Sequence, residues 1–169
     1  MSSATSTAPT NSTHVETLGM RMRVGRGAAD KFLSFNLNGQ AHAIPILKVK
    51  EIIRMMRITP LPHAAGYVRG IVNLRGKVVP VLDMRTRLGL EAGADTKRTC
   101  IVVVQVGKQN DTHFLGLVVD QVNEVLNIPA DAIEPPPDLG NGKEHLRGIG
   151  KIADRVVLVI DIHRVFAED

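Results

Sequence analysis

Two stretches of this chain are versions of one another. Residues 67–88 read YVRGIVNLRGKVVPVLDMRTRL, residues 145–166 read HLRGIGKIADRVVLVIDIHRVF, and the two align without a gap at an offset of 78. The repeated residues are Arg69, Gly70, Ile71, Val78, Val79, Val81 and Asp83, which recur as Arg147, Gly148, Ile149, Val156, Val157, Val159 and Asp161. A long repeat period indicates one structural unit built twice. Residues shared by both copies are expected to serve the fold, and residues present in one copy are candidates for function.

The repeat extends upstream at lower identity. Residues 43–53 (AIPILKVKEII) match residues 116–126 (GLVVDQVNEVL) at an offset of 73. We therefore predict a first repeat at about residues 31–88 and a second at about residues 100–166. A unit of roughly 60 residues is marginal for folding alone, so the two are expected to share a core or pack tightly. We expect them to superpose as similar barrels.

Short strands and frequent turns predict an all-β fold with a few short helices. The chain has 15 Gly and 9 Pro in 169 residues, which is typical of closely spaced strands and turns. The apolar runs IVVV (101–104) and GLVV (116–119) suit strands that are buried on both faces. Small barrels fit this pattern better than a helical or doubly wound fold.

The first 30 residues differ in composition from the rest. Residues 1–30 are rich in Ser, Thr and Ala and contain too little apolar surface to offset the entropy of ordering. We predict a flexible N-terminal tail there, followed by one domain over residues 31–169. Met20, Met22 and Val24 alternate with polar residues or Gly, which is a weak strand pattern within the tail.

Cysteine usage and hydropathy indicate the compartment. Cys100 is the only cysteine, so no disulfide forms within the chain, and the usual zinc-site spacings are absent. This usage suits a reducing compartment. Residues 1–30 lack an apolar stretch long enough for a signal peptide or a membrane span. The sequence therefore predicts a soluble, cytoplasmic protein.

The net charge of +4 is unevenly placed. Residues 48–87 hold nine basic and two acidic residues, which gives +7, whereas residues 88–169 hold eight basic and thirteen acidic residues, which gives −5. Residues 1–47 add four basic and two acidic residues, or +2. Such a division favours an oriented polar contact with a partner. A solvated basic face is the alternative interpretation.

No constellation of residues predicts catalysis, a metal site or a cofactor. Ser34 is the last serine, so the body of the chain has no serine nucleophile. Cys100 lies in the run TCIVVV, where a buried, inert thiol is expected. The six histidines are scattered without ligand spacing, and NLRGK is no phosphate-binding loop. Asp83 and Asp161 recur at equivalent strand ends, which favours helix capping over acid–base catalysis.

The two copies differ at one turn. Asn73, Arg75 and Gly76 of the first copy correspond to Lys151, Ala153 and Asp154 of the second. Gly76 is expected to supply a positive φ in a hairpin turn. A turn makes no demand for a guanidinium, so Arg75 is expected to bind a carboxylate, either that of Glu51 or one on a partner.

Five motifs in order resemble a known family, the CheW-like chemotaxis coupling proteins. They are ILKVKEI (46–52), GYVRGIVNLRGKVVPVLDMRTRLGL (66–90), GLVVDQVNEVL (116–126), IEPPP (133–137) and RGIGKIADRVVLVIDI (147–162). The resemblance covers roughly residues 31–166. The chain departs from the family at its 30-residue N-terminal extension and at residues 43–45, where many relatives carry an aromatic, Gly and Asp nearby.

The resemblance implies two SH3-like, five-stranded β-barrel subdomains related by internal duplication. It implies a non-enzymatic adaptor without a cofactor, which couples methyl-accepting chemoreceptors to the chemotaxis histidine kinase in signalling arrays. The implied partners are the regulatory domain of the kinase and the cytoplasmic tip of the receptor. The implied location is cytoplasmic, recruited to membrane-associated arrays without insertion into the membrane.

The resemblance also assigns residues. Val49, Cys100 and Val125 match positions of a hydrophobic groove between the barrels that takes the receptor tip. Glu51 and Arg75 match a polar pair that is important for coupling. Without the resemblance, the three apolar residues would be interpreted as ordinary core.

Three other functions compete with this one. Tandem small barrels could bind nucleic acid through the basic segment 48–87, but four Phe, one Tyr and no Trp leave little for base stacking. The chain could be part of a larger chemotaxis protein, such as a kinase regulatory domain, although residues 1–30 and a full-length domain argue against a fragment. An enzyme has no supporting residues.

Overall fold

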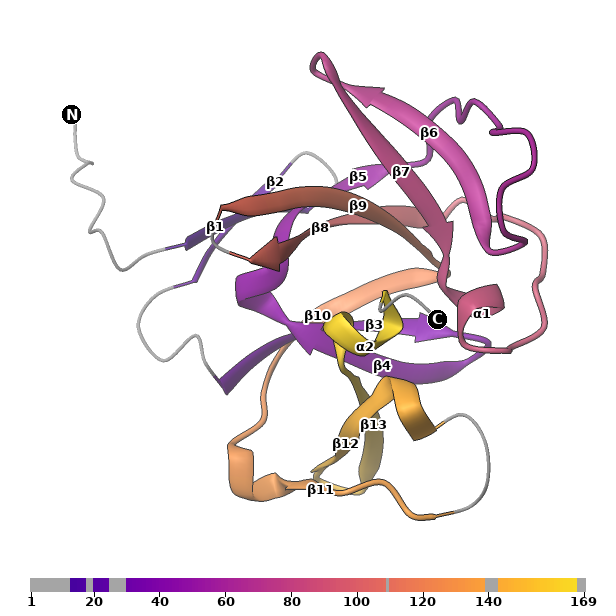
Figure 1. The fold of residues 1–169 in the computed structure, drawn as a ribbon. Coiled ribbons are helices and arrows are strands. Elements are labelled where there is room, and N and C mark those ends of the chain that lie inside the picture. Colours follow the sequence, from indigo (N-terminus) through magenta and orange to yellow (C-terminus); the bar gives the residue numbers. More distant parts are fainter. Residues whose placement is uncertain (1–12, 18–19, 25–29, 109, 139–142, 167–169) are drawn as a thin grey trace, which may run out of the picture.

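The computed structural model describes residues 13–17, 20–24, 30–108, 110–138 and 143–166 (Figure 1). Strands dominate. The helices are single turns, namely α1 (Met84–Arg87), α2 (Ile162–Val165), η2 (Ile46–Lys48), η3 (Ala130–Ala132) and η4 (Lys143–His145). The predicted all-β class with a few short helices is therefore confirmed. Within the described ranges, no helix has the length and apolar content needed to cross a bilayer.

The first sheet has seven strands in the order β2-β1-β5-β8-β9-β7-β6. Their bounds are β1 (Thr13–Thr17), β2 (Met20–Val24), β5 (Val49–Arg54), β6 (Val68–Leu74), β7 (Lys77–Asp83), β8 (Cys100–Lys108) and β9 (Asp111–Val119). Neighbouring strands run antiparallel except β1–β5 and β7–β9, which are parallel. We refer to β5, β6, β7, β8 and β9 as the first barrel, which forms the upper part of Figure 1.

The second sheet has six strands in the order β10-β3-β4-β13-β12-β11. Their bounds are β3 (Lys31–Leu37), β4 (Gln40–Pro45), β10 (Gln121–Asn127), β11 (Ile133–Glu134), β12 (Leu146–Ile152) and β13 (Arg155–Ile160). The pair β13–β4 is parallel and the remaining neighbours are antiparallel. We refer to β3, β4, β10, β12 and β13 as the second barrel, which lies below the first in Figure 1.

Each barrel contains strands from both copies of the repeat. The first barrel combines β5, β6 and β7 of the first copy with β8 and β9 of the second, and the second barrel makes the reciprocal combination. Val79 and Val157 occupy equivalent buried positions in β7 and β13, as the repeat predicts. The predicted fold of two small barrels is confirmed, but the expectation that each repeat forms one barrel is wrong. Neither barrel coincides with the repeat at residues 31–88 or the repeat at 100–166, because the chain crosses to the other sheet after β4 and after β9.

The exchange produces three apolar cores. One lies within the first barrel and contains Val72, Val79, Val81, Ile101, Val103 and Val118. Its counterpart in the second barrel contains Phe32, Ala43, Leu126, Ile128, Val157 and Val159. The largest lies between the two sheets and draws on both, with Leu33, Phe35 and Leu37 of β3 packed in one cluster with Val102 and Val104 of β8. The two barrels are therefore joined by an apolar core to which both contribute.

Strands β3 and β8 make this joint possible because both of their faces are apolar. In β8, Val102 and Val104 belong to the core between the sheets, whereas Ile101 and Val103 belong to the core of the first barrel. The run IVVV is therefore buried on both faces, as the sequence predicts. The equivalent strand β3 has the same double burial in the second barrel.

Two recurring glycines allow close approach of backbone. A Cβ on Gly70 would lie 2.1 Å from the carbonyl oxygen of Thr59, which bridges to Ile71 at the edge of β6. A Cβ on Gly148 would lie 2.5 Å from the carbonyl oxygen of Glu134 in β11. At each of these two places, a short extended segment packs so close to the glycine that a larger side chain would clash.

Asp83 and Asp161 cap the helical turns that follow them, as the repeat predicts. The Asp83 carboxylate accepts hydrogen bonds from the backbone N–H groups of Arg85 and Thr86. The Asp161 carboxylate accepts the equivalent bonds at the start of α2. Asp83 has a second role, because it lies 3.3 Å from the guanidinium of the buried Arg85.

The N-terminal segment contains two strands in the region for which the sequence predicts a flexible tail. β1 and β2 form a hairpin, and β1 pairs with β5 at Glu51 and Ile52. The alternation at residues 20–24 is the part of the sequence that indicates this hairpin. Residues 1–12, 18–19 and 25–29 lie outside the described residues, and their assignment to a flexible tail stays a prediction.

The two caps predict a measurable asymmetry. We expect Asp161→Ala to lower the free energy of unfolding by about 1 kcal/mol, the usual cost of a lost cap. We expect Asp83→Ala to cost about 3 kcal/mol, because it also removes a partner of a buried guanidinium. Urea denaturation of the two variants measures this difference. Equal losses would show that Arg85 gains nothing from Asp83.

Candidate functional site

The turn between β6 and β7 is the feature that only the first copy has. Arg75 and Gly76 occupy its two central positions with φ of 52° and 87°. The Asn73 side-chain oxygen accepts a hydrogen bond of 2.9 Å from the Gly76 N–H. The predicted positive φ at Gly76 is confirmed. The positive φ at Arg75 was not predicted, and the equivalent Ala153 adopts 55°.

Glu51 is the carboxylate that Arg75 binds. The Arg75 Nη2 donates to both carboxylate oxygens of Glu51, at 2.5 Å for Oε2. The Glu51 side chain is 7% exposed, whereas that of Arg75 is 69% exposed. The Glu51 carboxylate therefore lies inside the first barrel, and the Arg75 guanidinium covers it on the solvent side. Of the two partners that the sequence left open, the structure shows the internal one.

A β-bulge turns Glu51 inward. The register of β5 against β8 shifts between Val49 and Glu51, so that Glu51 lies opposite Val103 on the face of the first barrel's core. The second copy has the same bulge in β10 before Glu124. There, however, Glu124 is exposed and lies 3.7 Å from an equally exposed Arg155. Only the first copy buries its carboxylate.

The three predicted groove residues share one apolar cluster, but two of them are not at the surface. Val49 is 2% exposed and Cys100 is 1% exposed, both within the core between the sheets. Val125 is half-buried and packs against that core. Val49 and Cys100 therefore lie in a core to which both sheets contribute, and the assignment of Val49, Cys100 and Val125 to a receptor-binding groove stays a prediction.

Burial also affects the protonation of the Cys100 thiol. Removal from solvent raises the pKa of the Cys100 thiol to about 11, although a hydrogen bond with the Val122 backbone acts in the opposite direction. The thiol is therefore neutral at physiological pH, and the predicted inert cysteine is confirmed.

A hollow of about 310 Å³ adjoins Cys100 where the two barrels meet. It is lined by Arg54, Lys97, Arg98, Thr99, Cys100, Gln121 and Val122, and we call it the junction hollow. Val122 lies on the same face of β10 as Val125, because the bulge after Val122 brings both opposite residues of one face of β3. The part of the predicted groove that a partner can reach is this hollow with the β10 valines beside it.

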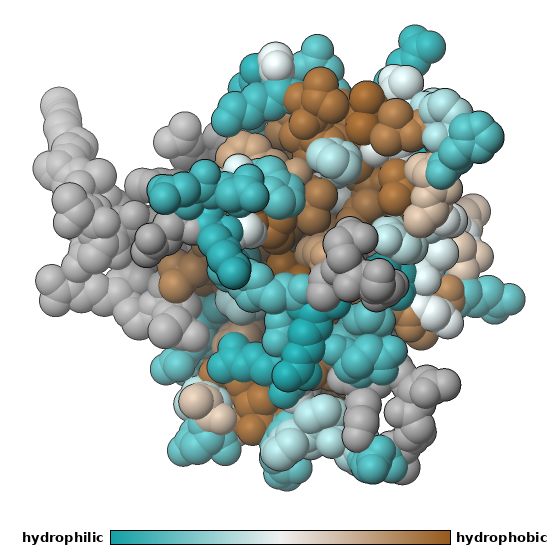
Figure 2. Space-filling view, viewed as in Figure 1, coloured by the Kyte–Doolittle hydropathy of each residue, from teal (hydrophilic) through white to brown (hydrophobic). Residues whose placement is uncertain are grey.

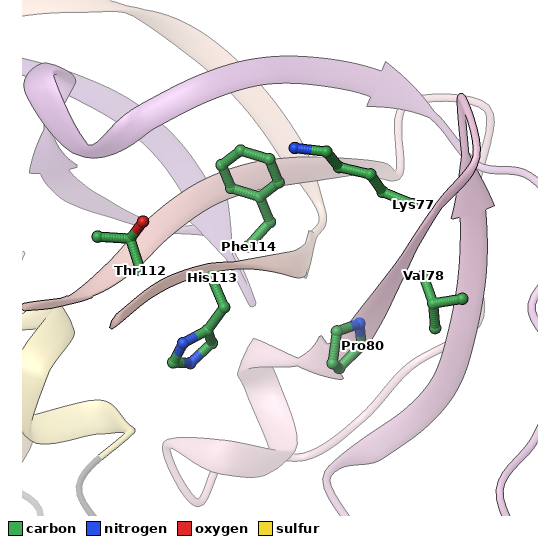
Figure 3. Close-up of a pocket in the computed structure, with 6 residues that line it drawn as sticks. All are labelled: Lys77, Val78, Pro80, Thr112, His113 and Phe114. Atoms are coloured by element: carbon green, nitrogen blue, oxygen red, sulfur yellow. The ribbon is translucent and has the colours of Figure 1, made fainter. Parts of the chain in front are cut away.

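Two further hollows occupy equivalent places on the two barrels. The β7–β9 hollow, of about 540 Å³, is lined by Lys77, Val78, Pro80, Thr112, His113 and Phe114 (Figure 3). The β4–β13 hollow, of about 550 Å³, is lined by Asn36, Gly39, Gln40, Ala41, Asn123, Glu124, Arg155 and Val156. At the offsets of the repeat, Val78 corresponds to Val156 and Lys77 to Arg155.

The exposed valines of these hollows were missed by the sequence argument. Val78 is 66% exposed and Val156 is 48% exposed, although both recur and were expected to serve the fold. The alternation with buried Val79 and Val157 is the signal that places them outside. Apolar side chains gather over the upper part of the molecule, where β6, β7 and β9 lie (Figure 2).

Phe114 distinguishes the β7–β9 hollow from its counterpart. The Nζ of Lys77 lies 4.7 Å from the centre of the Phe114 ring, and the two side chains extend toward one another (Figure 3). Lys50 lies 5.9 Å from the same ring. The second barrel has Ala41 at the equivalent position. The first barrel thus presents a cationic, aromatic surface and the second a smaller, mixed one.

Comparisons with known proteins define the class. Residues 31–169 match the family described as CheW-like domain. The chain is 34% identical over 141 residues to the chemotaxis protein CheW of Rhizobium meliloti (strain 1021), covering 82% of this chain and 88% of that protein. It is 29% identical over 147 residues to CheW of Klebsiella aerogenes, covering 86% of each.

A solved structure agrees with the fold as well. The scaffolding protein TtCheW from Thermoanaerobacter tengcongensis matches with a TM-score of 0.75 and 32% identity, over 83% of this chain and 94% of that one. The duplicated pair of SH3-like barrels is thereby confirmed. The chain belongs to the CheW-like domain family, whose members are non-enzymatic scaffold proteins of chemotaxis. The prediction that the chain is not an enzyme agrees with this family membership.

Because Glu51 is buried, removal of Arg75 is expected to lower the free energy of unfolding. Arg75→Ala leaves a buried carboxylate without the partner shown here, so we expect a loss of about 1–3 kcal/mol in the free energy of unfolding. The turn itself accepts alanine, as Ala153 shows at the same φ. Denaturant unfolding measures the loss.

Arg155→Ala is the matched control for this prediction. It breaks the ion pair of Arg155 with Glu124, the counterpart of Glu51. The two side chains are 57% and 56% exposed, so we expect a loss of at most about 1 kcal/mol. A loss for Arg75→Ala no larger than for Arg155→Ala would contradict the structural role of the internal pair.

Proposed function

We propose that this protein couples methyl-accepting chemoreceptors to the chemotaxis histidine kinase, with the receptor tip and the kinase on different surfaces. Family membership supports the chemotaxis scaffold. The observation that carries the finer assignment is the presence of separate hollows on the two joined barrels. A coupling protein needs at least two surfaces that can be occupied at once, and separate hollows support that proposal.

The receptor tip is assigned to the junction hollow and the valines beside it. A helical tip presents apolar side chains at helical spacing, which suit a groove of aliphatic residues. Val122 and Val125 are half-buried and supply that surface. Cys100 lines the hollow, and Val49 is buried in the same apolar cluster.

The kinase is assigned to the equivalent hollows on the two barrels. The family resemblance implies that the kinase regulatory domain has the same fold, and we therefore propose a contact between like barrel surfaces. Val78 and Val156 provide an exposed apolar centre in each hollow, with a charged side chain next to each. Apolar centres with polar rims are typical of protein interfaces.

The nucleic-acid alternative loses much of its basis in this structure. Several cations of the basic segment are already engaged within the protein. Arg69 lies 2.7 Å from Asp95, Arg75 binds Glu51, and the buried Arg85 lies near Asp83 and Asp120. Lys50 and Lys77 lie over Phe114. The ion pairs of Arg69, Arg75 and Arg85 therefore weigh against a continuous phosphate-binding surface along this segment.

Reciprocal variants test the two assignments. We expect Val125→Glu to reduce receptor-tip affinity by about tenfold or more, because the complex would desolvate a carboxylate, while leaving binding to the kinase regulatory domain unchanged. We expect Val78→Glu to leave receptor binding unchanged and to weaken kinase binding. Titration calorimetry with each purified partner measures both.

Val49→Glu serves as the control for folding in that experiment. Because Val49 is 2% exposed, a carboxylate there should lower the melting temperature sharply and abolish both contacts. The assignment of separate surfaces fails if Val125→Glu behaves in the same way, or if Val78→Glu loses the receptor tip.

The Glu51–Arg75 pair is assigned to coupling as well as to stability. It connects β5, which borders the junction, to the β6–β7 hairpin, which borders the β7–β9 hollow. We expect Arg75→Ala, assayed at a temperature where it is folded, to bind both partners yet fail to activate the kinase in a receptor mixture. Activation at the wild-type level would contradict this role, and Arg155→Ala is again the control.

A further inference from the structure

The junction hollow concentrates positive charge that nothing in the described structure neutralises. Arg54 at the end of β5 and Lys97 and Arg98 before β8 all line it, and all three are exposed. None of them forms an ion pair with any residue that the structure describes, whereas Arg69, Arg75 and Arg85 of the same barrel are each paired. Three like charges around one hollow repel one another, and an anion would relieve that repulsion.

Besides the three cations, the hollow is lined by uncharged residues, the polar Thr99 and Gln121 together with Cys100 and Val122. The Cys100 thiol is neutral, because burial raises its pKa to about 11. Val122 is half-buried and continues into the core between the sheets. A ligand that fits must therefore combine a negative group with an aliphatic stem. The side chain of Glu or Asp, carried by a segment whose other residues are apolar, has this combination.

We propose that the junction hollow binds an acidic side chain of the helical partner, held by Arg54, Lys97 and Arg98, while apolar residues of the same helix pack on Val122 and Val125. This inference rests on the proposed receptor contact and adds a charged determinant to it. The aliphatic surface supplies contact area, and the three cations select which helix binds and in which register.

A protein carboxylate suits the hollow better than a nucleic-acid phosphate. The residues that line it include no aromatic side chain on which a base could stack. Its volume of about 310 Å³ is small, and its extension along β10 is apolar rather than basic. These features match an amphipathic helix that carries one or two acidic side chains.

The test removes the three charges together. The variant Arg54→Ser, Lys97→Ser, Arg98→Ser alters only exposed side chains, so its folding should be unchanged. The probe is a purified helical hairpin that contains a chemoreceptor signalling tip. We expect the variant to bind it about tenfold more weakly than wild type near 0.05 M salt, and to differ little from wild type near 0.5 M salt, where charges are screened.

A matched variant controls for net charge. Lys108→Ser, Lys151→Ser, Arg164→Ser removes three exposed cations that line none of the three hollows, and it should keep wild-type affinity and salt dependence for the tip. Replacing acidic residues of the tip by Gln, one at a time, should weaken binding to wild type but not to the junction variant. This non-additivity identifies the side chain that the hollow holds.

The outcomes separate this inference from the proposed function. If the junction variant binds the tip with the affinity and salt dependence of wild type, the inference is wrong and the proposed receptor contact remains. Failure of wild type to bind the tip overturns both. Binding of a single-stranded oligonucleotide that is lost only in the junction variant reassigns the hollow to phosphate and overturns the acidic-helix proposal.

Discussion

The apolar layer between the two sheets is the interaction on which the rest of the structure depends. It exists because β3 and β8 are apolar on both faces. One face of each strand packs in the core of its own barrel, and the other face packs in the core between the sheets. Neither repeat has enough residues to bury a sufficient core alone. Reciprocal exchange of strands makes the two barrels one folding unit, since separating them would expose Leu33, Phe35, Val102 and Val104.

This joint also explains why a duplicated protein can serve as a scaffold. The two barrels carry hollows at equivalent positions, and a third hollow lies at the seam between them. Differences between the copies then give each surface its own chemistry. Phe114 stands where the other barrel has Ala41, and Glu51 is buried where Glu124 is exposed.

Charge in this protein is divided between structure and surface. Most arginines of the first barrel are used internally, either closing the barrel wall over Glu51 or holding α1 and the loop at Asp95 in place. Arg54, Lys97 and Arg98 remain without ion-pair partners among the described residues, and they gather at the seam. Internal ion pairs thus engage Arg69, Arg75 and Arg85 of the basic segment, whereas the cations at the seam are accessible to a partner.

The sequence by itself determined the duplication, the all-β class, the caps at Asp83 and Asp161, the turn at Gly76 and the inert Cys100, because each follows from local spacing or local geometry. Only the tertiary structure decided which strands share a barrel, that Val49 and Cys100 are covered, and that Val78 and Val156 are exposed. The physical reason is that alternation in a strand separates its two faces but does not identify what covers each one. When both faces are apolar, as in β8, that choice depends on strands distant in the chain.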